Sequence, residues 1–201
     1  MTMIGTGVAE STPSDSKMAS PIRVISMSHD VRFPDSVLFS LEAESDSPIT
    51  EIRLFYNLES RSVQVYGYPD FEPDNRVSTK FSIKTSGSKY IPAGVNFEYY
   101  YQITDASGNT LETSRFNFAY RDPRYRWQEV RRGDLVVFWH NLSREKVESV
   151  VADVVVQIDA IRDMFELIEP VPMKAVIVNS AAEARRTFPF KSNAFKLLFI
   201  I

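Results

Sequence analysis

Residues 77–85 read VSTKFSIKT, and the side chains alternate in character along this stretch. One set of alternate positions carries Val77, Phe81 and Ile83 together with two threonines, whereas the other set carries only serine and lysine. A strand that buries one face and exposes the other has this period of two, which is typical of antiparallel sheets. The stretch therefore predicts a half-buried β-strand.

The same period recurs throughout residues 22–120. Strong strands are also predicted at 37–43, 52–58, 97–103 and 116–120, and weaker ones near 22–28 and 62–66. Turn-forming residues separate them, among them Asp46-Ser47-Pro48 and the loop from Asp105 to Asn109, where Gly108 or Asn109 would take a left-handed conformation. Seven short strands without an intervening helix predict a mainly β fold, an antiparallel β-sandwich of the immunoglobulin-like or fibronectin-III-like kind.

The period changes after residue 127. Apolar residues at alternating steps of three and four, from Val147 to Ile168, predict a helix of about 25 residues that is capped by Ser143 and ended by Pro170. Buried strands are predicted on either side of it, at 135–139 and 173–178, and a second helix is predicted to begin at a capping box, Ser180 to Glu183. Strand and helix alternate as in an α/β layer, but with too few strands to complete one. We therefore expect an incomplete α/β unit, with the helix stripe on one sheet face and the opposite face, lined by Val137, Trp139 and Val176, uncovered.

These patterns divide the chain into four parts. We predict a disordered tail at 1–21, an Ig-like β-sandwich at 22–120, a linker at 121–134 and a partial α/β domain at 135–201. The linker region YRDPRYRWQEVRRGD combines arginines with aromatic residues, as a single-strand nucleic-acid platform would. Acidic residues interleave them, however, which favours a solvated connector.

Composition excludes several classes of function. The 201 residues carry a net charge of −3, so no basic field would collect nucleic acid or an anionic membrane. The absence of cysteine rules out disulfides, cysteine-based zinc sites and a thiol nucleophile. No signal peptide and no membrane span are evident, so the protein as written is expected to be cytoplasmic unless its true start lies upstream.

The sequence contains no complete catalytic or metal site. The two histidines, His29 and His140, are far apart, and each is better explained as a structural residue than as a catalytic one. Two carboxylate pairs, Glu42 with Glu44 and Asp159 with Asp163, are expected on solvated faces, and the sequon Asn141-Leu142-Ser143 overlaps the predicted helix cap. We therefore predict no catalytic, metal or cofactor-binding residue.

Several stretches nevertheless resemble a known family. In the first half they are Ile49–Tyr56, Tyr90–Gly94 and Phe97–Asn109, and they are similar to the Ig-like or fibronectin-III-like module that heads certain bacterial zinc metallopeptidases of the peptidase MA-like (gluzincin) type. In the second half they are Asp122–Trp127, Phe138–His140 and Glu183–Pro189, and they are similar to the linker and opening of that peptidase domain. The family holds zinc through H-E-x-x-H and a later glutamate. No position here matches that motif, so the resemblance assigns no functional residue.

Three hypotheses follow for the function. The first is a non-catalytic N-terminal portion of a truncated peptidase MA-like protein, because the ending FKLLFII, residues 195–201, looks like a buried strand cut short. The alternative is an exported, extracytoplasmic zinc metallopeptidase whose catalytic half lies beyond this chain. A second alternative is a stand-alone protein-interaction β-sandwich. The expected partners are a protein or peptide ligand and further copies of this chain, associating through the incomplete α/β half.

Overall fold

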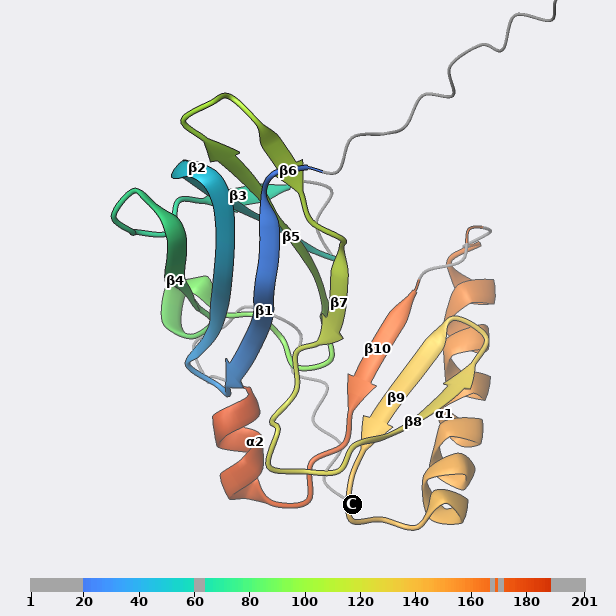
Figure 1. The fold of residues 1–201 in the computed structure, drawn as a ribbon. Coiled ribbons are helices and arrows are strands. Elements are labelled where there is room, and N and C mark those ends of the chain that lie inside the picture. Colours follow the sequence, from blue (N-terminus) through green and yellow to red (C-terminus); the bar gives the residue numbers. More distant parts are fainter. Residues whose placement is uncertain (1–19, 60–63, 167–168, 170–171, 189–201) are drawn as a thin grey trace, which may run out of the picture.

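The computed structural model describes residues 20–59, 64–166, 169 and 172–188. These residues form a mainly β protein with ten strands and two helices. Strands β1–β7 build a folded antiparallel sheet, and strands β8–β10 build a smaller sheet that lies beside it (Figure 1). The predicted disordered tail and the ending FKLLFII lie almost entirely outside the described residues.

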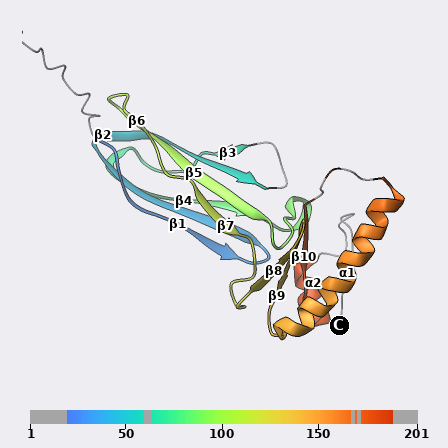
Figure 2. The same ribbon diagram turned by 90° about the vertical axis from the view of Figure 1, so that its right-hand side faces the viewer.

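Strand β2 (Ser36–Leu58) organises the larger sheet because it belongs to both of its layers. Its first half pairs with β1 (Arg23–Arg32) and β4 (Asp74–Lys84). Its second half pairs with β3 (Val65–Gly67) and β5 (Asn96–Asp105). The sheet thus folds over on itself, as Figure 2 shows, and forms a sandwich-like body.

The predicted turn at Asp46-Ser47-Pro48 is wrong, since these residues lie within β2. The register of β2 shifts here against both neighbours, between Glu44 and Ile49 and again between Ile49 and Glu51. Irregularities of this kind bend a strand without ending it. The side-chain amide of Asn75 donates hydrogen bonds to the carbonyls of Ser45 and Asp46, so the bend leaves these groups paired. The strands predicted at 37–43 and 52–58 are therefore parts of one continuous strand, β2.

Short strands complete the second layer. β6 (Thr110–Glu112) and β7 (Phe116–Ala119) pair with successive parts of β5. The loop between β5 and β6 is the predicted hairpin, and Gly108 takes the left-handed conformation with φ +82°. Between β4 and β5 the chain makes a short 3₁₀ turn, η1 (Gly87–Lys89).

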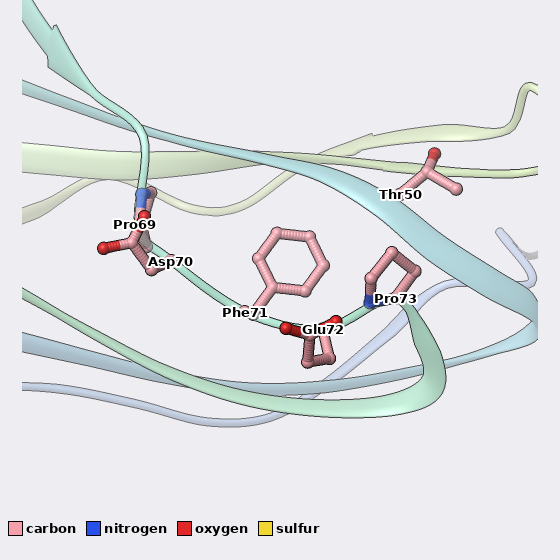
Figure 3. Close-up of a pocket in the computed structure, with 6 residues that line it drawn as sticks. All are labelled: Thr50, Pro69, Asp70, Phe71, Glu72 and Pro73. Atoms are coloured by element: carbon pink, nitrogen blue, oxygen red, sulfur yellow. The ribbon is translucent and has the colours of Figure 1, made fainter.

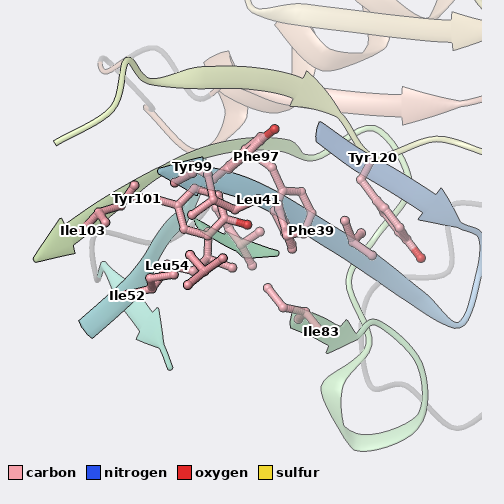
Figure 4. Packing of buried hydrophobic residues seen from close by; sticks show 14 of the residues in the cluster. Phe39, Leu41, Ile52, Leu54, Ile83, Phe97, Tyr99, Tyr101, Ile103 and Tyr120 are labelled. Carbon is pink, nitrogen blue, oxygen red and sulfur yellow. The ribbon is translucent and has the colours of Figure 1, made fainter. Parts of the chain in front are cut away.

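Alternate residues of these strands meet in one core, as the period of two predicts. Phe39 and Leu41 from the first half of β2 face Ile52 and Leu54 from its second half, while β5 adds aromatic rings (Figure 4). All buried members of this cluster lie between residues 22 and 120. Among the residues that the structure describes, the core of the sandwich thus takes no buried member from outside this range.

The second unit is a three-stranded sheet covered by a helix. Strand β9 (Leu135–Trp139) pairs antiparallel with β8 (Gln128–Arg132) and parallel with β10 (Met173–Val176). Helix α1 (Arg144–Met164) begins at Ser143, whose hydroxyl accepts a hydrogen bond from the Lys146 amide, as predicted. Helix α2 (Ala181–Thr187) likewise begins at its predicted cap, Ser180. Strand β8 was not predicted and lies inside the expected linker.

The expected open face of the small sheet is covered. Val137 and Trp139 lie under α1 with Val147 and Val151, not on the far face. Phe138, on the opposite side, packs towards Gly94 of the sandwich, where a Cβ would approach its ring to 3.1 Å. Figures 1 and 2 both show the sheet between α1 and the sandwich.

The end of α1 departs from the predicted stripe. Ile161 and Phe165 are exposed, whereas Val147 and Val151 near the start of the helix are buried against the sheet. Ile168 lies outside the described residues.

Candidate binding face

The outer side of the second layer carries a row of aromatic rings. Phe55 of β2 pairs in register with Tyr66 of β3 on one side and with Tyr100 of β5 on the other. Residues paired in this way project to the same face of a sheet. Tyr68 follows two positions after Tyr66 and brings a fourth ring to that side. We call Phe55, Tyr66, Tyr68 and Tyr100 the aromatic face.

Gly67 explains how β3 presents both of its tyrosines outward. A Cβ on this residue would point into the sandwich and lie 2.3 Å from the ring of Phe81. Only glycine therefore lets β3 lie this close to the core. Because neighbouring residues of a strand point to opposite faces, an inward Gly67 places Tyr66 and Tyr68 on the outside.

The four rings form a row in which each ring contacts the next. The ring centroids of Phe55 and Tyr100 lie 5.0 Å apart and the rings are nearly parallel, at 11°. Tyr66 lies 6.1 Å from Phe55 and 5.7 Å from Tyr68. Tyr66 and Tyr68 are 57% and 55% exposed, whereas Tyr100 is only 7% exposed. The aromatic face is therefore open at the β3 edge and covered over β5.

Polar side chains surround the rings. The guanidinium of Arg115 lies 4.2 Å from the centroid of Tyr100 and donates a hydrogen bond of 3.1 Å to Glu98. This hydrogen bond raises the pKa of Arg115. On the other side Gln64 donates to the Tyr100 hydroxyl at 3.0 Å. These contacts cover Tyr100 and hold its ring in place.

Arg53 plays a similar part near Tyr68. Its guanidinium lies 5.8 Å from the Tyr68 centroid, while its Nε donates a hydrogen bond of 2.6 Å to Glu51. The hydrogen bond with Glu51 raises the pKa of Arg53. Each arginine beside the aromatic face is thus paired with a carboxylate.

A pocket of about 460 Å³ opens beside this face (Figure 3). It lies between β2 and the segment that leads from β3 to β4. We call it the acidic pocket, and it is lined by Thr50, Pro69, Asp70, Phe71, Glu72 and Pro73. Pro69 directly follows Tyr68, so the acidic pocket begins where the aromatic face ends.

The two histidines lie in different units of the structure. His29 of β1 stacks on Phe118 with centroids 3.8 Å apart, and its Nδ1 lies 3.4 Å from the Tyr99 hydroxyl. Burial lowers the pKa of His29, and the nearby Asp30 carboxylate opposes this effect. A histidine held between core rings is a packing residue.

His140 is buried at the end of β9 and is 1% exposed. Its Nε2 lies 2.5 Å from Glu183 Oε1, and its ring stacks on Tyr125 at 3.9 Å. The Asn179 side chain donates to its backbone carbonyl. A histidine enclosed in this way joins α2 to β9 and does not present a reactive nitrogen to a substrate.

The other candidates are also accounted for. Glu42 pairs with Arg76 and Glu44 with Arg23 on the solvated side of the sheet. Asp159 and Asp163 are exposed on α1, and Ser143 of the sequon caps that helix. Among the described residues, no group of three or more potential metal ligands is present.

The arginine-rich connector packs more closely than a solvated linker. Asp122 is buried and holds Arg124 through three nitrogen–oxygen contacts of 2.5–3.1 Å. Trp127 donates to the Asp122 carbonyl, and Tyr125 covers His140. These aromatic rings are therefore engaged with the protein itself and do not form a nucleic-acid platform.

Sequence reasoning missed the aromatic face. The signal was present, because Phe55 and Tyr100 occupy the alternate positions expected to face solvent in 52–58 and 97–103. Large aromatic residues on a predicted wet face are unusual enough to mark a binding surface. Their meeting in one row depends on strand register, which the sequence does not reveal.

No family model matches the chain, and a search of the curated proteins finds no match. Among solved structures, a crystal structure of the carbohydrate-binding module family 56 β-1,3-glucan binding domain is similar, with a TM-score of 0.31 and 19% sequence identity. The match covers 46% of this chain and 95% of that one.

These comparisons contradict the resemblance to peptidase MA-like metallopeptidases. No family model and no curated protein matches the chain, so neither sequence comparison supports that resemblance. The interpretation as the N-terminal portion of a metallopeptidase is therefore wrong, and the stand-alone β-sandwich alternative agrees better with the findings. No helix within the described residues is long and apolar enough to cross a membrane.

Proposed function

We propose that this chain is a non-catalytic binding module that holds a carbohydrate on its aromatic face. The observation that carries the proposal is the row of contacting rings on an outer sheet face, with Tyr66 and Tyr68 more than half exposed. A folded protein gains no core stability from rings that remain in water. Exposed aromatic clusters of this kind are suited to contact a ligand.

The mixture of rings and polar groups suits a sugar. A pyranose ring presents apolar C–H groups on its flat side and hydroxyls around its edge. The rings of Tyr66 and Tyr68 can contact the flat side, while the tyrosine hydroxyls and Gln64 can hydrogen-bond to the edge. A few placed polar groups beside an apolar surface are the usual composition of a small-molecule site.

Direct binding measurements test the proposal. Isothermal titration calorimetry against soluble β-1,3-glucan, β-1,4-glucan and xylan oligosaccharides should find at least one ligand. Tyr66→Ala and Tyr68→Ala should each weaken its binding about tenfold, because each removes one stacking surface. The matched control is Phe116→Ala, since Phe116 is also exposed but contacts Tyr99 on the opposite side of β5.

Two outcomes would overturn the proposal. One is that the unaltered protein binds none of these glycans. The other is that it binds one and both tyrosine variants bind as tightly as Phe116→Ala does.

A protein ligand is the second candidate. Tyrosine is enriched at protein interfaces, and two of the four rings are exposed tyrosines. Capture of a defined protein partner that is lost in Tyr66→Ala, with no glycan bound, would favour it.

A further inference from the structure

We propose that the acidic pocket is a second part of the same binding site, and that it selects an uncharged glycan over an anionic one. This inference rests on the proposed function and adds to it a subsite and a ligand class. The geometry of the pocket, the chemistry of its lining and the charges around it each support the assignment.

The acidic pocket continues the aromatic face. Tyr68 is followed directly by Pro69, which lines the pocket, and Thr50 lines its other side three residues before Arg53 on β2. Arg53 itself contacts the Tyr68 ring. A chain of sugars that lies on Tyr66 and Tyr68 along the β3 edge therefore reaches the pocket without leaving the surface.

The size of the pocket fits a small ligand. Its volume of about 460 Å³ falls within the range of about 300–1,000 Å³ typical of small-molecule sites. Phe71 packs against the sandwich core, and Thr79 donates a hydrogen bond of 2.7 Å to the Asp70 carbonyl. These two contacts fix the segment that forms the pocket wall, so the wall exists before a ligand arrives.

The described lining residues supply hydrogen-bond acceptors and no cationic side chain. The carboxylates of Asp70 and Glu72 lie at the pocket, and neither takes part in an ion pair with another described residue. Thr50 contributes a hydroxyl, which itself donates weakly to the Thr104 carbonyl at 3.4 Å. A ligand that binds here must bring hydrogen-bond donors, and sugar hydroxyls are such donors.

The surrounding charges disfavour an anion. The two arginines beside the aromatic face are already paired, Arg53 with Glu51 and Arg115 with Glu98 and Glu112. The unpaired carboxylates of the acidic pocket are therefore uncompensated. A ligand that carries carboxylates or sulfates would be repelled at this end of the site.

A cationic ligand would also be attracted to the acidic pocket, but it fits the remainder of the site poorly. Arg115 already occupies the face of Tyr100, and Arg53 lies beside Tyr68. A second cation over these rings would meet a guanidinium. The uncharged glycan is the class that suits both parts of the site.

The test compares one glucan in two charge states. The full chain is titrated with a soluble β-glucan hexasaccharide and with its carboxymethylated derivative, at low and at high salt. Asp70→Asn/Glu72→Gln is titrated in the same way. The matched control is Asp153→Asn/Asp159→Asn, which makes the same change in charge on exposed positions of α1.

We expect the unaltered protein to bind the neutral hexasaccharide at least tenfold more tightly than the carboxymethylated one at low salt. High salt should reduce this preference, since the repulsion is screened. Asp70→Asn/Glu72→Gln should bind the neutral ligand about fivefold more weakly and should lose most of the preference. The α1 control should behave as the unaltered protein does.

The other outcomes separate the inference from the proposed function. If the pocket variant binds both ligands as the unaltered protein does, while Tyr66→Ala loses binding, the pocket inference is wrong and the proposed function stands. If the unaltered protein binds no glycan, both fail. If a lysine-rich peptide binds and Asp70→Asn/Glu72→Gln abolishes its binding, the ligand is cationic and the inference is overturned.

Discussion

His140 and Glu183 meet at 2.5 Å inside the second unit, where both residues are almost completely buried. Glu183 also accepts a hydrogen bond of 2.9 Å from the Asn179 backbone amide through its other oxygen. Glu183, which was predicted to complete a capping box with Ser180, thus accepts a hydrogen bond from the residue before that cap, Asn179. Its other oxygen contacts His140 at the end of β9. This contact joins the start of α2 to the end of the central strand.

Breaking this contact should destabilise the second unit. Glu183→Ala removes the carboxylate partner of the buried His140 ring, which among the described residues keeps only the Asn179 side-chain amide at 3.2 Å from Nε2, and also removes the acceptor of the Asn179 backbone amide. We expect a loss of about 3 kcal/mol in the free energy of unfolding. Urea denaturation monitored by near-ultraviolet circular dichroism should detect it, because the Trp127 ring lies 4.7 Å from the His140 ring.

An exposed ion pair provides the control. Arg144 and Glu148 form an i,i+4 pair on α1, and Glu148→Ala, which breaks this pair but leaves Arg144 over the Trp139 ring, should cost no more than about 0.5 kcal/mol. An equal, small effect of the two substitutions would show that the buried contact contributes nothing beyond a surface pair.

The two cores predict different behaviour for the two halves of the chain. Every described member of the sandwich cluster lies within residues 22–120, so a fragment of residues 20–122 should fold alone and melt cooperatively as a β-protein. A fragment of residues 121–188 should self-associate, because it would expose Phe138, which packs against the sandwich at Gly94. Circular dichroism and light scattering on both fragments check this, and a monodisperse second fragment would contradict it.

The alternation of apolar and polar residues along the sequence predicted most of the strands of the sandwich. The faces of 77–85 are buried and exposed as their alternation predicts, whereas in 97–103 the predicted inner face is buried but Tyr100 on the other face is buried as well. The turn predicted at Asp46-Ser47-Pro48 does not form, because turn propensity is a local signal that pairing with neighbouring strands can override. Pairing of β2 with β4 on one side of this point and with β5 beyond it holds the backbone extended.

Features that depend on contacts with distant parts of the chain could not be predicted from the sequence. Strand β8 reads QEVRR, and only Val130 is apolar, so its pairing with β9 leaves almost no pattern. The sandwich covers the Phe138 side chain, and nothing in the sequence of residues 135–139 indicates this contact. The aromatic face likewise requires three strands in register.

Asp105 should make stability depend on pH. The Asn109 side chain donates to its carboxylate at 2.9 Å, and Ser45 donates at 2.8 Å from the bend of β2. The Asn109 hydrogen bond, with those of Ser45 and the backbone amides and against the opposing effect of burial, holds the pKa of Asp105 below its usual value. A depressed carboxyl pKa contributes stability above the unfolded pKa, near 4, and this stability is lost as the pH falls through the folded pKa.

Asp105→Asn tests this pH dependence. The variant should unfold at lower urea concentration than the unaltered protein at pH 7, and the difference should shrink as the pH is lowered below about 4. The control is Asp46→Asn, which alters an exposed carboxylate on the same bend. A difference between Asp105→Asn and the unaltered protein that does not change with pH would mean that the charge of Asp105 is not what stabilises the loop.

Arg115 should limit how far a ligand extends across the aromatic face. Its guanidinium covers Tyr100, which is buried although the neighbouring rings on β3 are open. In Arg115→Ala the Tyr100 ring becomes accessible, so we expect a glycan hexasaccharide to bind about threefold more tightly and a disaccharide to bind unchanged. The loss of an exposed cation–π contact should change the stability of the protein only slightly.

The matched variant is Arg53→Ala, because Arg53 also lies beside a ring of the face but Tyr68 is already open. It should not increase the affinity for the hexasaccharide. Calorimetric titration of both variants with ligands of two to six sugar units distinguishes the roles of the two arginines. Weaker binding of every length by Arg115→Ala would contradict this prediction, because it would mean that Arg115 contacts the ligand or positions the Tyr100 ring for it and does not merely cover that ring.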